Sequence, residues 1–69
     1  MDLPLNKSWP EAVGRNVDEV VQEIQAENSS YEVVKVQEGS PTTRDMRFNR
    51  VRVFYNTTTN LVTSEPRTG

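Results

Sequence analysis

The chain contains no cysteine, and this absence limits its possible folds strongly because the chain is only 69 residues long. A domain of this size buries a small fraction of its surface, and many such domains depend on disulfide bonds. Here one hydrophobic core, helped by polar contacts, must hold the structure together. We therefore expect a single domain over residues 1–69 without disulfides.

The composition also argues against several classes of function. Histidine is absent as well, which removes the commonest general base and a common metal ligand. We therefore expect no enzyme activity, no metal site and no cofactor. Eight basic residues against ten acidic ones give a net charge of −2, whereas nucleic-acid binders usually carry a basic excess. No apolar run approaches the ~20 residues of a membrane helix, so we expect no membrane partner.

The N-terminal segment is polar and without periodicity over residues 1–7, which predicts a flexible arm. Residues 1–4 have neither a basic flank nor an apolar run, so we predict no signal peptide in this chain. Pro10 suits the first turn of a short helix that begins near Ser8. Trp9 is the only tryptophan, and we expect it to lie in the core.

Residues 17–27 are predicted to form an amphipathic helix. Apolar residues recur at the spacing i, i+3, i+4 and i+7, namely at Val17, Val20, Val21 and Ile24. Asn16 is a suitable N-cap, and Glu19 resembles the reciprocal partner of a capping box. Residues 28–30, Asn-Ser-Ser, are expected to end the helix.

Two β-strands are predicted after the helix. Residues 31–36 are rich in β-branched side chains, and residues 50–55 alternate strictly. In the second strand Val51, Val53 and Tyr55 share one face, on which Tyr55 is expected to join the core. The opposite face carries Arg50, Arg52 and Phe54.

The remaining segments complete an α+β fold, in which one α-helix packs on a small β-sheet. Residues 56–60 are expected to form a turn, and residues 61–62 a short edge strand. No helix connects the two long strands. The antiparallel arrangement is the default for such a pair, although a long connection also permits a parallel one, and the pattern leaves the direction open.

The segment between these strands, residues 38–49, is an unusually long loop without periodicity. Loops of about this length are usually functional or disordered. Pro41 fixes its own backbone and pushes Ser40 toward an extended conformation, which the next two threonines also favour. Residues 40–45 are therefore predicted to present an extended stretch to solvent, with Arg44 near its centre. Proteases bind their substrates in this shape.

Two arginines of the following strand are placed to support this loop. Arg50 and Arg52 project from the same face, and a loop folded over that face would lie above both guanidinium groups. Thr43 and Asp45, on either side of Arg44, offer hydrogen-bond acceptors to them. Such a brace would take the place of a disulfide in holding the loop.

Two other interpretations of these residues stay open. In the first, the basic patch of the loop and strand binds anions or nucleic acid through Arg44, Arg47, Arg50 and Arg52, with Phe48 beside them. In the second, the chain is an interaction module for an unrelated partner. The net charge and the acidic Asp45 within the patch weigh against nucleic acid.

Residues 39–56, GSPTTRDMRFNRVRVFYN, resemble the reactive loop and following strand of the potato inhibitor I family of serine-protease inhibitors. Residues 8–14 and 66–69 are similar to the two ends of that family's domain. The resemblance implies a helix packed on a small mixed sheet, in which the loop links two parallel strands. It also implies that Arg44–Asp45 is the scissile bond and that Arg44 occupies the specificity position.

The resemblance assigns supporting roles as well. It implies that Thr43 and Asp45 hydrogen-bond to Arg52 and Arg50 respectively, and that Gly69 packs near these arginines. The protease-contacting residues would be Ser40, Pro41, Thr42, Thr43, Met46 and Arg47. Family members commonly carry Leu or Met at the specificity position and inhibit chymotrypsin or subtilisin.

Arg44 therefore shifts the expected partner of a monomeric inhibitor to trypsin-like serine proteases, because a basic side chain suits their primary pocket. Chymotrypsin and subtilisin-type enzymes are further candidates. The resemblance is consistent with a role in plant defence. Plant seed storage tissue and a secreted mature form are both open as the location.

Overall fold

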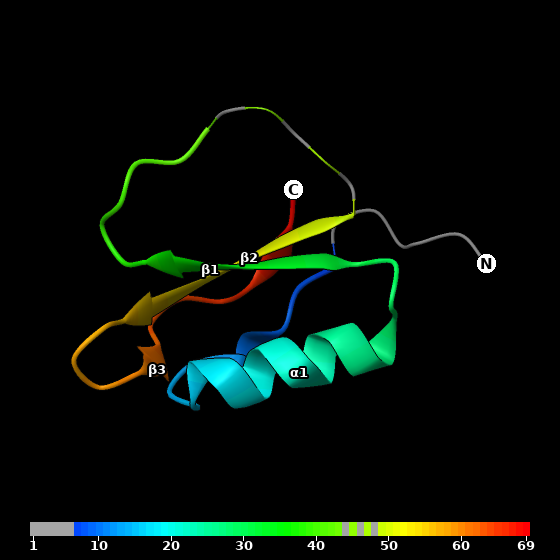
Figure 1. Ribbon diagram of the computed structural model, residues 1–69. Coiled ribbons are helices and arrows are strands. Elements are labelled where there is room, and N and C mark those ends of the chain that lie inside the picture. Colours follow the sequence, from blue (N-terminus) through cyan, green and yellow to red (C-terminus); the bar gives the residue numbers. More distant parts are fainter. Residues whose placement is uncertain (1–6, 44, 46, 48) are drawn as a thin grey trace.

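A computed structural model describes residues 7–43, 45, 47 and 49–69 of the chain. Its elements are the 3-10 helix η1 (Pro10–Ala12), the helix α1 (Val17–Glu27) and the strands β1 (Glu32–Gln37), β2 (Arg50–Asn56), β3 (Leu61–Val62) and β4 (Arg67–Thr68). The predicted α+β fold is confirmed, since one α-helix packs on a mixed sheet of four strands (Figure 1). The predicted N-terminal arm falls outside the described residues except for Lys7.

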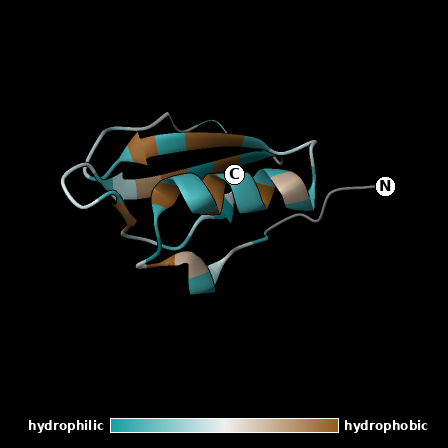
Figure 2. Ribbon diagram, turned by 60° about the horizontal axis from the view of Figure 1, so that its bottom comes forward, coloured by the Kyte–Doolittle hydropathy of each residue, from teal (hydrophilic) through white to brown (hydrophobic). Residues whose placement is uncertain are grey.

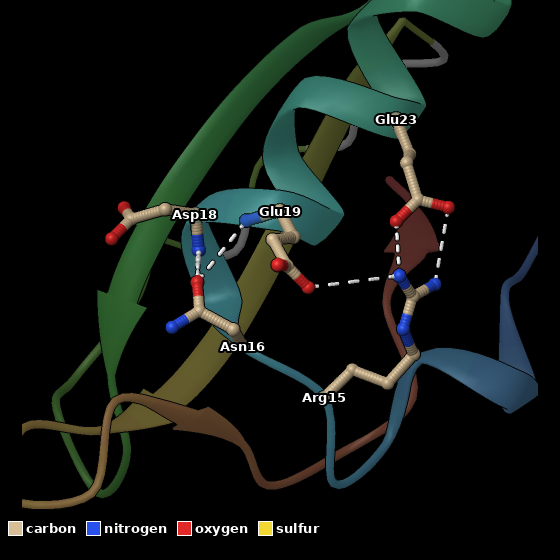
Figure 3. Close-up of polar contacts among 5 residues, drawn as sticks. All are labelled: Arg15, Asn16, Asp18, Glu19 and Glu23. Atoms are coloured by element: carbon tan, nitrogen blue, oxygen red, sulfur yellow. Dashed lines mark hydrogen bonds and ion pairs between the residues drawn. The ribbon is translucent and has the colours of Figure 1, made fainter.

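Helix α1 begins where the sequence predicts because Asn16 caps it. The Asn16 side-chain oxygen accepts hydrogen bonds from the backbone N–H groups of Asp18 (2.9 Å) and Glu19 (3.2 Å), as Figure 3 shows. The prediction of a reciprocal capping-box partner is wrong: among the described residues, the Glu19 carboxylate accepts no hydrogen bond from the Asn16 N–H. The Glu19 carboxylate instead approaches the Arg15 guanidinium, 3.9 Å away, because the opposite charge attracts it. No helix of the described residues is long and apolar enough to cross a membrane.

The core lies between α1 and the face of β2 that the alternation predicts. Hydrophobic and hydrophilic bands alternate along α1 in Figure 2, and the apolar residues turn inward. The buried hydrophobic residues are Trp9, Ala12, Val17, Val20, Ile24, Tyr31, Val51, Val53 and Val62. Tyr55 is half-buried and packs against this cluster. All of these side chains are largely apolar, so the core stabilises the fold mainly by removing apolar surface from water.

Trp9 anchors the N-terminal segment to the core, as predicted. Its ring meets that of Tyr31 edge to face, with centroids 5.5 Å apart and an interplanar angle of 83°. Its indole N–H donates to the Glu27 carboxylate at 2.7 Å. The buried tryptophan therefore keeps its polar group satisfied at the end of α1.

The two long strands run parallel, which resolves the direction that the alternation left open. Their register pairs Glu32 with Arg50 and ends at Gln37 with Tyr55. Six strand residues rise about 20 Å, and the extended reach of residues 38–49 is about twice that. The connection can therefore return along the whole strand without a helix. Figure 1 shows its described part arching over the side of the sheet opposite α1.

The short strands β3 and β4 both pair with β2 in the antiparallel direction. Strand β3 agrees with the prediction, whereas β4 was not predicted, and β1 begins one residue later than predicted. Strand β4 brings the C-terminal residues beside the start of β2, where Val51 pairs with Thr68. This placement matters for the site, because it sets Gly69 next to Arg50.

Candidate functional site

Arg50, the first residue of β2, is a buried arginine that joins two segments of the chain. It is only 7% exposed. Its Nη2 donates to the backbone carbonyl of Asp45 at 2.7 Å, and its Nη1 donates to the Asp45 carboxylate at 3.1 Å. Its Nε donates to the carbonyl oxygen of Gly69 at 3.0 Å. Burial of this charge is tolerable because a carboxylate and two carbonyl oxygens replace water around it.

The C-terminal residues hold Arg50 from the other side. The Gly69 N–H donates to the Arg50 carbonyl at 2.9 Å, and the Thr68 N–H donates to the Lys7 carbonyl at 3.0 Å. Strand β4 is thus bonded on both of its edges, to β2 and to the segment before η1. Because β4 is held on both sides, Gly69 at its end is a fixed acceptor for the Arg50 side chain.

Arg52 supports the loop at a second point. It lies two residues along β2 from Arg50 and therefore projects from the same face. Its Nη2 donates to the Thr43 hydroxyl oxygen at 2.6 Å. The two arginines consequently contact the residues immediately before and immediately after residue 44. The structure contains the two pairings that the family resemblance implied, Thr43 with Arg52 and Asp45 with Arg50, and it places Gly69 beside Arg50.

The Asp45 carboxyl is held in its ionised form. The pKa of this carboxyl lies below its ordinary value of 3.8, chiefly because the Thr43 hydroxyl hydrogen-bonds to it; burial opposes this shift, and the Arg50 guanidinium lowers the pKa further. Asp45 is therefore a carboxylate at neutral pH. Its charge complements the buried guanidinium.

Most described residues of the loop are exposed to solvent. Pro41, Thr42, Thr43, Asp45 and Arg47 are exposed, and Ser40 is half-buried. Gly39 has φ = +80°, a left-handed conformation that turns the chain out of β1 and that favours glycine. The Ser40 N–H donates to the Gln37 carbonyl at 3.1 Å and closes this turn. Arg44, Met46 and Phe48, which the sequence also placed in the site, lie outside the described residues.

One contact of the loop was missed by the sequence analysis. Arg47 Nη2 lies 3.0 Å from a carboxylate oxygen of Glu32, the first residue of β1. Arg47 and Arg50, two of the four arginines of the anion-binding alternative, are thus each paired with a carboxylate, which weighs against that alternative. Only the parallel register, which sets Glu32 beside Arg50, would have indicated this pair.

The described residues contain no cluster of acidic side chains suited to a metal ion. The arrangement is instead that of an exposed loop fixed from beneath by its own strand. Such a loop can enter the cleft of another protein in a shape that already exists before binding.

The sequence profile described as Potato inhibitor I family matches residues 3–69. The chain belongs to this family. Eglin C of Hirudo medicinalis is 48% identical over 63 residues, covering 91% of this chain and 90% of that protein. The protease inhibitor HPI of Hevea brasiliensis is 46% identical over 66 residues, covering 96% and 93%. A Cucurbita maxima relative, described as an inhibitor of trypsin and Hageman factor, is 39% identical and covers 96% of both chains.

Two solved structures share the fold over the full length of both chains. The crystal structure of bitter gourd trypsin inhibitor superposes with a TM-score of 0.87 at 30% identity. The solution structure of Cucurbita maxima trypsin inhibitor-V superposes with a TM-score of 0.70 at 38% identity. The chain is therefore a serine-protease inhibitor, as the family resemblance implied, and not an enzyme.

Proposed function

We propose that the chain inhibits trypsin-like serine proteases and that Arg44–Asp45 is its reactive bond. The observation that carries the proposal is the pair of arginine contacts, Arg52 to Thr43 and Arg50 to Asp45, which bracket residue 44. Trypsin-like enzymes carry an aspartate at the base of the primary pocket, and the guanidinium of Arg44 suits it. Two relatives whose names include trypsin, from Cucurbita maxima and bitter gourd, support this choice.

Binding uses the extended backbone of the loop. Residues 40–43 would pair with the enzyme as an added strand, while the Arg44 side chain enters the primary pocket. Because the arginine contacts hold the loop before the encounter, little ordering entropy is lost on association. Interfaces of protease–inhibitor complexes bury about 1,600 Å² in total, which a protruding loop and its flanks can supply.

Resistance to cleavage follows from the same contacts. The enzyme's serine oxygen attacks the Arg44 carbonyl carbon, the bond to the Asp45 nitrogen breaks, and the released amine takes up the proton held by the enzyme's base. In an ordinary substrate this amine diffuses away. Here Arg50 holds Asp45 by two hydrogen bonds, so the amine stays near the acyl carbon, attacks it and restores the peptide bond.

A titration against trypsin, chymotrypsin and subtilisin tests the proposal, with Arg44→Leu as the decisive variant. We expect stoichiometric loss of trypsin activity with the parent chain. The Arg44→Leu variant should bind trypsin at least about 30-fold more weakly, the effect of losing a buried anchor residue. It should also gain inhibition of chymotrypsin, whose primary pocket is apolar.

Arg15→Leu is the matched control, since Arg15 pairs with Glu23 of α1 on the opposite side of the sheet. This variant should inhibit trypsin as the parent does. Undiminished trypsin inhibition by Arg44→Leu would remove Arg44 from the specificity position. Inhibition of chymotrypsin or subtilisin alone by the parent would assign the inhibitor to another target class.

A further inference from the structure

The return end of the loop is attached to β1 as well as to β2. The Arg47 guanidinium reaches Glu32 at 3.0 Å, and the Glu32 N–H donates to the Asn49 carbonyl at 2.8 Å. The Arg50 N–H donates to the Arg47 carbonyl at 3.1 Å. Both side chains of the ion pair are about half exposed, 48% for Arg47 and 49% for Glu32. The pair therefore lies at the surface, directly beside the braced segment.

We propose that Glu32 is a positioning residue for the inhibitory loop, acting through Arg47 as a third anchor on the leaving-group side. The inference rests on the proposed reactive bond, because Arg47 is three residues beyond Arg44, on the side that carries the released amine. It adds to the two arginine contacts a fixed point that neither of them supplies.

This third anchor restrains the cleaved loop in a direction that Arg50 does not. After cleavage, the segment from Asp45 to Asn49 is joined covalently only to β2. Arg50 binds this segment through its side chain at Asp45 and through its backbone N–H at the Arg47 carbonyl, so both contacts attach the segment to β2 alone. Glu32 belongs to a different strand, and its contact with Arg47 is lost when the segment swings.

The charges of this region are also balanced by Glu32. Arg47 is paired with Glu32, and Arg50 is paired with Asp45. If Glu32 is neutralised, Arg47 loses its partner, and Asp45 is then the nearby carboxylate for both Arg47 and Arg50 among the described residues of the loop. Competition for Asp45 would then weaken the bond from Arg50 that holds the leaving amine.

The test compares Glu32→Gln with the parent in prolonged incubation with trypsin. We expect the bond after residue 44 to be hydrolysed about 1.5- to 5-fold faster, the range for losing a half-exposed ion pair, while the association rate is unchanged. Raising the ionic strength should bring the hydrolysis rate of the parent toward that of the variant, since salt screens exposed charges. In an Arg47→Ala background the Glu32→Gln change should have no further effect, because the partner is already gone.

Glu23→Gln is the matched control, since Glu23 also pairs with an arginine at about half exposure, on α1 (Figure 3). Its hydrolysis should equal that of the parent. Three results would overturn the proposal: unchanged hydrolysis of Glu32→Gln, an equal increase in Glu23→Gln, or an increase that persists with Arg47→Ala. Unchanged hydrolysis together with slower association would assign the ion pair to the encounter with the enzyme instead.

Hydrogen exchange in the free protein separates this proposal from the trypsin proposal. The Arg50 amide reports its bond to the Arg47 carbonyl without any protease, and it should exchange faster in Glu32→Gln than in the parent or in Glu23→Gln. Unchanged exchange would refute the role of Glu32. If the Arg50 amide exchanges faster in Glu32→Gln, as expected, but the parent chain does not inhibit trypsin, only the proposed target is refuted.

Discussion

Arg50→Ala removes the buried guanidinium beneath the loop and is the most informative single change. The variant loses the bond to the Asp45 carbonyl, the bond to the Asp45 carboxylate and the bond to Gly69. The first two act directly on the residue that bears the leaving amine. The third orients Arg50 itself. The loop should therefore keep its sequence and its exposed backbone but lose the contacts that return the amine to the acyl carbon.

The size of the effect follows from the bond to the Asp45 carbonyl. A hydrogen bond from a charged donor contributes about 1.5–3 kcal/mol, and we take the lower value because water can enter the space left by the side chain. We assign no free energy to the carboxylate contact, since the Asp45 side chain is 53% exposed and water can solvate it. A loss of about 1.5 kcal/mol corresponds to about tenfold faster hydrolysis.

The assay incubates each variant with a catalytic amount of trypsin and follows the cleaved chain by mass spectrometry. Arg52→Ala, which loses one bond to a hydroxyl group, should be hydrolysed at a rate between those of the parent and Arg50→Ala. Arg15→Ala serves as the control for removing an arginine elsewhere. Circular dichroism checks that each variant is folded. A folded Arg50→Ala chain that is hydrolysed no faster than the parent would refute the tether.

Two further predictions concern stability. Four carboxyls have lowered pKa values, each chiefly because of a side-chain hydrogen bond: Asp18, Glu23, Glu27 and Asp45. Their contribution to stability is therefore fully present above the ordinary pKa values of 3.8 and 4.5. It is lost as the pH falls through the lower pKa values of the folded state. Urea denaturation at a series of pH values should show this loss on the acidic side, and an unfolding midpoint independent of pH there would contradict it. Asn16→Ala removes the cap of α1 and should cost about 1 kcal/mol, or about 4–8 °C in the melting temperature, whereas Gln22→Ala on the exposed side of the helix should change it little.

The secondary structure was predictable where a local pattern determines it. The stripe from Val17 to Ile24 and the cap at Asn16 placed α1 with its observed bounds, and the alternation after Arg50 placed β2. Strand β4 escaped prediction because two residues, Arg67 and Thr68, carry no periodicity. They are a strand only because β2 offers them an edge.

The site was predictable to the extent that it depends on spacing along one strand. Arg50 and Arg52, two residues apart, had to share a face, and a loop above them had to meet both. The partner of Arg47 was not predictable in this way, because Glu32 lies fifteen positions earlier in the chain and becomes its neighbour only through the parallel pairing of β1 with β2.

The sequence by itself determined the helix, the alternating strand, the lack of any disulfide and the basic residue in the loop, because each of these depends on residues close together in the chain. The tertiary structure decided the direction of the two long strands, which the residue pattern had left open, and it alone decided the burial of Arg50 and the contact between Glu32 and Arg47. These features depend on how segments distant in sequence pack together. A hydrogen bond between such segments forms only after the core has fixed their separation.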